Sequence, residues 1–115
     1  MVGLYDFSVC ISMLNEEDNV GQCIDSILES SKGFNCELLL LNNGSTDDTK
    51  EILSGYEYIE NCQVVSFDQT VGLNLARNFL LKRCNSKLAV FLDADGVVSP
   101  NYFSILLQNI SPEFS

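Results

Sequence analysis

The stretch Leu88-Ala-Val-Phe-Leu-Asp-Ala-Asp-Gly-Val-Val98 joins a short apolar run directly to two carboxylates and a glycine. A short apolar run bounded by polar and turn residues is typical of a strand buried on both faces of a sheet. Residues i and i+2 of an extended backbone point to the same side, so Asp93 and Asp95 are expected to project together from the strand end. Two convergent carboxylates suit a hard cation such as Mg2+ or Mn2+, which in turn suits a diphosphate. The alternative interpretation is a polar turn that only closes the strand.

The rest of the chain alternates predicted strands with predicted helices. Four strands are expected, at Phe7–Met13, Glu37–Leu41, Gln63–Phe67 and Leu88–Leu92. Four helices are expected, after an N-cap at Asn15, after a capping box of Ser45 and Asp48, over Leu73–Cys84, and from Pro100. The strands are short and rich in β-formers, and the helices repeat apolar residues three and four positions apart. This order predicts an α/β fold, with a mostly parallel sheet and helices on both faces.

The polar turns of this pattern all follow strands. They lie at Leu14-Asn15, Asn42-Asn43, Asp68-Gln69 and Asp93 to Asp95. Because ligands of open α/β sheets bind beyond the carboxyl ends of the strands, these turns predict a binding site at that edge.

The segment Asn42-Asn-Gly-Ser45 has two interpretations. Its amide side chains carry both donors and acceptors that can recognise a nucleobase, and Gly44 lets a backbone approach closely. The alternative is an ordinary turn with a helix cap.

Arg77 and the acids Glu16 and Glu17 are also ambiguous. Arg77 is one of only six bases in the chain and could neutralise a phosphate, or it could be a surface arginine paired with an acid. Glu16 and Glu17 could be a general acid and base, but negative charge at a helix start explains them well enough.

Composition excludes several classes of protein. The net charge of −10 disfavours non-specific binding to nucleic acid or anionic lipid. No apolar run reaches the roughly 20 residues of a membrane helix, and no signal peptide is visible, so a cytoplasmic location is expected. The five cysteines are spread singly and the chain has no histidine, which argues against a zinc site or a Cys–His nucleophile. Cys10 and Cys23 are expected to be small core residues.

Four motifs, in order, make the chain resemble the nucleotide-binding half of family 2 glycosyltransferases, which have the GT-A fold. The segments are Ser8-Val-Cys-Ile-Ser-Met-Leu-Asn-Glu-Glu17, Leu41-Asn-Asn-Gly-Ser-Thr-Asp-Asp48, Val71-Gly-Leu-Asn-Leu-Ala-Arg-Asn78 and Val90-Phe-Leu-Asp-Ala-Asp-Gly96. The resemblance covers nearly the whole chain. It implies a Rossmann-like GT-A subdomain over residues 1–115.

The resemblance also implies roles for individual residues. Asp93-Ala-Asp95 is similar to the family's DxD motif, in which Asp95 would ligate Mn2+ or Mg2+ and Asp93 would hold the ribose or the metal. Asn43 matches a position that contacts the base, and Arg77 matches an arginine behind the diphosphate. The residues expected at the nucleotide are Ser12, Leu14, Asn15, Asn43, Arg77 and Asp93.

The chain departs from the family pattern in two ways. Asn42-Asn43 stands where the family commonly has two aspartates, which leaves the base preference open. The family's acceptor-binding half and catalytic base follow the DxD motif, whereas this chain stops soon after it. The acceptor half is therefore expected to be absent, and Glu113 lies in an expected tail.

The resemblance implies a glycosyltransferase that moves a sugar from a nucleoside-diphosphate sugar, most often UDP-linked, to a glycan, protein or lipid hydroxyl, with inversion. The alternative is a non-catalytic nucleotide-binding or assembly module. Apolar surface exposed by truncation would favour a homo-oligomer. A third alternative arises because Phe91–Val97 resembles the first motif of haloacid-dehalogenase-like phosphatases, but the lysine and further acids of that family do not follow it.

Overall fold

The computed structural model describes residues 5–110, in which strands and helices alternate along the chain. The strands are β1 (Phe7–Met13), β2 (Cys36–Asn43), β3 (Cys62–Phe67) and β4 (Ala89–Phe91). The helices are α1 (Val20–Ser30), α2 (Thr49–Ser54), α3 (Leu73–Arg83) and α4 (Tyr102–Gln108). The predicted α/β order is confirmed. Glu113 lies outside the described residues.

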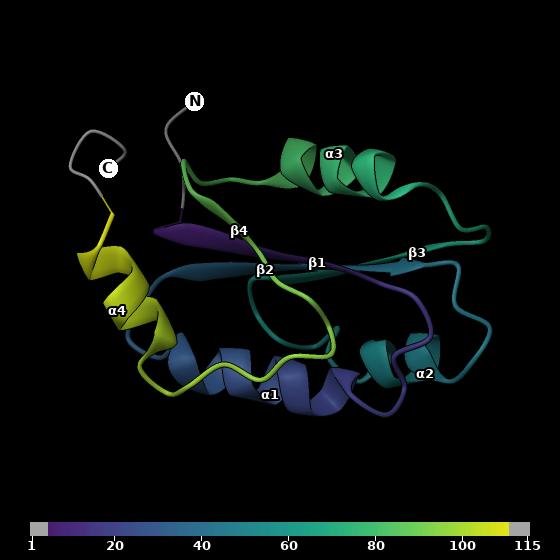
Figure 1. Ribbon diagram of the computed structural model, residues 1–115, viewed down its shortest axis with the longest axis horizontal. Helices are drawn as coiled ribbons and strands as arrows, with labels where there is room; N and C mark the ends of the chain where they lie inside the picture. Colours follow the sequence, from purple (N-terminus) through teal and green to yellow (C-terminus); the bar gives the residue numbers. More distant parts are fainter. Residues whose placement is uncertain (1–4, 111–115) are drawn as a thin grey trace.

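The strands form one parallel sheet in the order β3-β2-β1-β4. The chain moves outward from β1 through β2 to β3, and then crosses back to place β4 on the other side of β1 (Figure 1). The direction of winding therefore reverses between β1 and β4. In doubly wound sheets, ligands bind outside the carboxyl ends of the strands at such a reversal.

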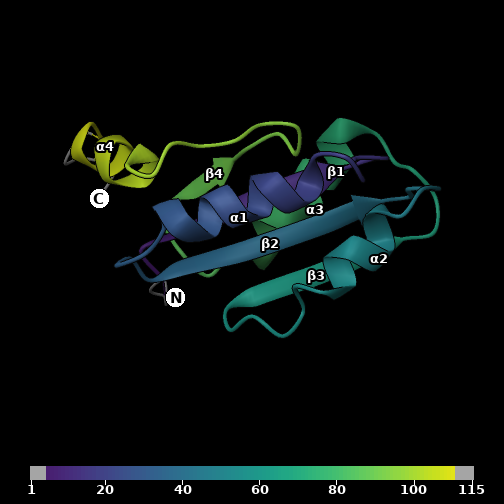
Figure 2. The same ribbon diagram turned by 90° about the horizontal axis from the view of Figure 1, so that it is seen from below.

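Helices cover both faces of the sheet, as predicted. Figure 1 shows α3 on one side of the sheet, with α1 and α2 on the other. Figure 2, seen from the α1 side, shows α1 lying along the central strands and α2 near β3. The larger apolar core lies on this side and includes Phe7, whose ring stacks on Phe103 of α4 at 4.8 Å between centroids. Within residues 5–110, no helix is long and apolar enough to cross a bilayer.

The prediction that Leu88–Leu92 is buried on both faces is wrong. The strand is reduced to three residues, Ala89–Phe91, and none of them is fully buried. Phe91 keeps 37% of its surface exposed. The physical reason is position, because β4 lies at the edge of the sheet and pairs only with β1. An apolar run does not reveal whether its strand is central or at an edge.

Three predicted helix starts also differ from the structure. α1 begins at Val20 with Asn19 as its N-cap, so Asn15 is not the cap and no acidic residue lies in the first turn. α2 begins at Thr49 after Asp48, with no side-chain cap. α4 begins at Tyr102 rather than Pro100. Among the predicted capping residues, Asn15 and Ser45 each accept hydrogen bonds from the other's loop instead of from a helix.

Candidate functional site at the carboxyl edge

Asn15 joins the loops that follow β1 and β2. Its backbone lies in the left-handed region (φ 54°), which asparagine adopts more readily than most residues. Its Oδ1 accepts hydrogen bonds from the backbone N–H groups of Thr46 at 2.8 Å and Asp47 at 3.2 Å. Its own N–H donates to Ser45 Oγ at 2.9 Å. One side chain therefore fixes two of the loops predicted to border the ligand.

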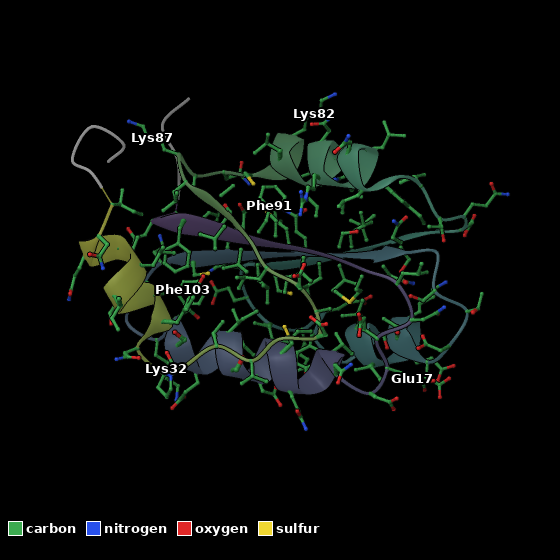
Figure 3. The ribbon with its side chains drawn as sticks, viewed as in Figure 1. Glu17, Lys32, Lys82, Lys87, Phe91 and Phe103 are labelled. Atoms are coloured by element: carbon green, nitrogen blue, oxygen red, sulfur yellow. The ribbon has the colours of Figure 1, made fainter. Side chains whose placement is uncertain are left out.

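The backbone of Glu16 and Glu17 continues this contact. Glu16 N donates to Thr49 Oγ1 at 2.9 Å, and Glu17 N donates to Asp47 Oδ2 at 3.2 Å. The other carboxylate oxygen of Asp47 accepts from Thr49 N at 2.9 Å. Figure 3 shows Glu17 at the end of the molecule where α1 and α2 begin. The acidic segment therefore docks β1's loop onto the start of α2.

These surroundings shift the pKa values of Glu17 and Asp47 in opposite directions. Desolvation raises the pKa of Glu17, and the charges of Asp47 and Asp48 raise it further. Desolvation acts on Asp47 in the same sense, but hydrogen bonds from Thr49 and from the backbone of Glu17 outweigh it and lower the pKa of Asp47. Asp47 therefore acts as a structural hydrogen-bond acceptor whose ionised form is favoured. In Glu17 the neighbouring carboxylates disfavour the ionised form.

Asn43 holds the loop between β3 and α3. Its Nδ2 donates to Val71 O and its Oδ1 accepts from Val71 N, both at 2.9 Å. Thr70 Oγ1 donates to the carbonyl oxygen of Asn43 at 2.9 Å. Asn43 is only 7% exposed. Its nucleobase-binding role stays a prediction, and it would have to use the amide hydrogen-bonding positions that Val71 does not occupy.

Gly44 is required by the same loop. Its φ is +80°, and a Cβ placed there would lie 2.6 Å from Thr70 N and 2.8 Å from Gln69 C. The predicted close approach of a backbone to Gly44 is therefore present, but the approaching backbone belongs to this chain. The neighbouring Asn42 is also buried and bonds to Ser45 N and Ser66 Oγ.

The Asp93-Ala94-Asp95-Gly96 segment is a β-turn, closed by a hydrogen bond from Gly96 N to Asp93 O at 3.2 Å. The expectation of two carboxylates projecting from one extended strand is therefore wrong, because regular strand ends at Phe91. Both aspartates are nonetheless exposed, while Ala94 between them is 4% exposed and belongs to the core. The buried Ala94 side chain fixes the turn against the core. The carboxylates of Asp93 and Asp95 remain exposed and accessible to a ligand.

A row of small side chains on α1 holds the chain that carries this turn. Cys23 Sγ donates to Asp93 O at 3.6 Å, and Ser26 Oγ accepts from Val98 N at 3.1 Å. One helical turn further on, Ser30 Oγ accepts from Phe103 N at 3.3 Å. We call Cys23, Ser26 and Ser30 the anchor row. The sequence alone did not reveal this function; the only signal was that these small residues lie three and four positions apart.

Cys23 also reports the charge around the turn. Burial raises its pKa to about 11, and the charges of Asp95, Glu16 and Asp93 contribute to the rise. The loop after β1 leads into the N-terminal end of α1, where Val20 N bonds to Glu16 O, and the turn after β4 meets Cys23 near that same end.

Arg77 lies on α3 beside β4. Its guanidinium carbon is 5.8 Å from the centroid of the Phe91 ring, a cation–π distance. Phe91 precedes Asp93 by two residues, so Arg77 is brought to the end of the strand that leads into the turn. Ser12 lies in β1 opposite Leu41 of β2, and Leu14 is exposed directly after β1.

The carboxylates of Asp93 and Asp95 suit a cation that binds together with its substrate. Within residues 5–110, no group of three or more His, Cys, Asp or Glu side chains could enclose a metal ion. Mg2+ is usually held by one or two carboxylates, with water and substrate phosphates as its other ligands. The oxygen donors present therefore fit a shared protein–diphosphate site better than a closed all-protein site.

Comparison with known proteins identifies the family. The model of glycosyl transferase family 2 matches residues 8–114, and the chain belongs to this family. It is 35% identical over 106 residues to the minor teichoic acid biosynthesis protein GgaB of Bacillus subtilis (strain 168). That match covers 90% of this chain and 12% of GgaB, so the chain spans only a small part of this relative.

Solved structures share the fold. The crystal structure of S. aureus TarS in complex with UDP-GlcNAc has a TM-score of 0.77 and 22% identity, over 90% of this chain and 30% of that one. The mannosyltransferase PcManGT from Pyrobaculum calidifontis, in complex with GDP-Man and Mn2+, has a TM-score of 0.72 and 20% identity. This second match covers 81% of this chain and 28% of that one. The predicted GT-A-like fold is confirmed.

Proposed function

We propose that the chain is the nucleotide-sugar-binding part of a glycosyltransferase, with a UDP-sugar as donor. The observation that carries this proposal is the Asp93–Gly96 turn, which presents two exposed carboxylates where the winding of the sheet reverses. Membership of family 2 supports sugar transfer. The TarS complex with UDP-GlcNAc supports a uridine nucleotide.

The chain's acidity explains why a diphosphate would need these groups. A net charge of −10 repels an anionic donor unless local positive charge compensates. In this proposal Asp95, helped by Asp93, holds Mn2+ or Mg2+, and the bound cation would stabilise negative charge on the leaving diphosphate. Arg77 supplies a second positive group from α3, oriented over Phe91.

The loop residues have positioning roles in the same proposal. Asn15 holds the loops after β1 and β2 together, which supports a positioned edge at which Ser12 and Leu14 would contact the nucleotide. Asn43 fixes the loop before α3 and offers its remaining hydrogen-bonding capacity to the base. These loops would orient the nucleoside while the turn after β4 holds the diphosphate.

The proposed reaction is direct displacement with inversion. An acceptor hydroxyl of a glycan, protein or lipid forms a bond to the anomeric carbon while the bond to the diphosphate oxygen breaks. We assign no residue between 5 and 110 as the base that takes the hydroxyl proton. A cytoplasmic location stays a prediction.

An assembly module is the second candidate. Three leucines of α3, at positions 73, 75 and 81, are each more than half exposed, and Phe91 is partly exposed beside this helix. Exposed apolar surface of this kind favours protein–protein contact. A homo-oligomer without nucleotide binding would fit this alternative.

Calorimetric titration of UDP into the protein, with and without Mn2+, tests the first proposal. We expect Mn2+-dependent binding that weakens at least about tenfold in Asp95→Asn, because one of two metal-binding carboxylates is lost. Asp48→Asn, which removes an exposed charge elsewhere at the same edge, should bind as the unmodified chain does. Binding indifferent to Mn2+ and to Asp95→Asn would remove the metal role, whereas a folded sample that binds no UDP would favour assembly.

A further inference from the structure

Cys10 and Cys84 bring two thiols together on the α3 side of the sheet. Cys10 lies in β1 and is fully buried, and Cys84 is the C-cap of α3. Their sulfur atoms are 3.5 Å apart, although 74 positions separate them along the chain. Both thiols are free, as are Cys23, Cys36 and Cys62. The separation is short enough for small side-chain movements to bring the sulfurs within bonding distance.

Cys84 is the more accessible member of this pair. It is half-buried, and the cationic residues Lys82, Arg83 and Lys87 surround it in the sequence. Figure 3 shows Lys82 on α3 and Lys87 at the start of the segment leading into β4. Three of the six basic residues of an otherwise acidic chain thus lie within three positions of Cys84 in the sequence, and this local positive charge favours an anionic reagent.

We propose that Cys10 and Cys84 form a redox-responsive pair, which a small anionic disulfide such as oxidised glutathione converts to an intramolecular disulfide. The sulfur of Cys84 first attacks one glutathione sulfur, and the other glutathione leaves as a thiolate. The sulfur of Cys10 then attacks Cys84, and the second glutathione leaves. Two protein thiols are oxidised, one external disulfide is reduced to two thiols, and the two protein protons pass to the departing glutathiones.

The surroundings of Cys10 set the rate of the second step. Burial, followed by the contact with Cys84, raises the pKa of Cys10 well above its ordinary value. Little of the attacking thiolate is therefore present, and we expect closure to be slower than the first exchange. The oxidised form joins β1 to the end of α3, the helix that carries Arg77.

The test is incubation of the folded protein with oxidised glutathione at pH 8, followed by peptide mass mapping without reduction. We expect a Cys10–Cys84 peptide lighter by two hydrogens, and a rise of at least about 5 °C in Tm that a reductant reverses. Cys84→Ser should abolish both. The matched control Cys36→Ser with Cys62→Ser removes two thiols outside the pair and should keep both.

Three outcomes would overturn the proposal. The first is a stable glutathione adduct on Cys84 that does not close, and the second is a mixture of all cysteine pairings. The third is no reaction under conditions that oxidise a simple dithiol. Since nucleotide is absent from the assay, none of these outcomes bears on the proposed transferase function.

Discussion

Asn15 shows how a single side chain can hold two loops of the carboxyl edge. The sequence pattern around this residue predicts a helix N-cap, and that prediction is wrong. N-caps and loop bridges use the same chemistry, because each needs a short amide or carboxylate that accepts backbone N–H bonds. Only the folded position of the loop after β2 decides between the two.

Gly44 offers a test of close backbone approach. Gly44→Ala should lower the free energy of unfolding by roughly 3 kcal/mol, because a Cβ adds both left-handed strain and a clash with Thr70 N. Gly33→Ala is the matched control, since Gly33 has a similar φ of +87° and a Cβ added there would meet no atom within 4 Å. It should cost only about 1 kcal/mol. Urea unfolding measures both variants. An equal loss of unfolding free energy in Gly44→Ala and Gly33→Ala would show that the contact with Thr70 does not contribute to stability.

Asp47 should make part of the stability pH-dependent. Its pKa is lowered in the folded state, so its contribution is present above the unfolded pKa of about 3.9 and is lost as pH falls through the lower folded value. Asp47→Asn should therefore be less stable than the unmodified chain at pH 7, and this difference should shrink toward pH 3. Urea unfolding at both pH values measures it.

Asp48→Asn is the control for this pH effect. Asp48 also raises the pKa of Glu17, but hydrogen bonds to the Asp47 carboxylate are what lower the pKa of Asp47. Removal of the Asp48 charge should thus leave stability at pH 7 unchanged or slightly higher. A loss equal to that of Asp47→Asn would mean that charge alone, rather than hydrogen bonding, explains the effect.

At the scale of elements, α1 determines where the chain after β4 lies. The anchor row bonds to the backbone at Asp93, Val98 and Phe103, in the same order along the helix and along the segment. This segment has little regular structure of its own between β4 and α4. The sequence of α1 is notable mainly for its apolar face. The same helix also positions the proposed diphosphate-binding turn.

Ser26→Ala tests the anchor row. It removes the acceptor for Val98 N, and the amide of Val98 should exchange its hydrogen roughly fivefold faster, the equivalent of about 1 kcal/mol. Ser54→Ala is the matched control, because Ser54 Oγ bonds to a carbonyl three residues back, as Ser26 Oγ does. The control should leave Val98 unchanged. An unaffected Val98 amide in Ser26→Ala would show that other contacts hold the segment.

At the scale of the whole molecule, the alternation of elements was enough to predict the parallel α/β fold and to place the four polar turns after its strands. The hydrophobic periods are local properties that the sequence shows directly. The exposure of β4, the bond partners of Asn43 and the anchor row could not be predicted, because each depends on which distant segments become neighbours. The Asp93–Gly96 segment is a β-turn, as one of the two interpretations has it, and it leaves both aspartates exposed. The metal-binding interpretation stays a prediction.

The strand order also has a consequence for synthesis of the chain. Ser8 of β1 pairs with Glu37 of β2 on one side and with Ala89 of β4, far later in the sequence, on the other. A ribosome completes β1, α1 and β2 well before β4 emerges. The two aspartates are therefore synthesised after β1, α1 and β2, and they reach an edge of the sheet at which the other loops are already present.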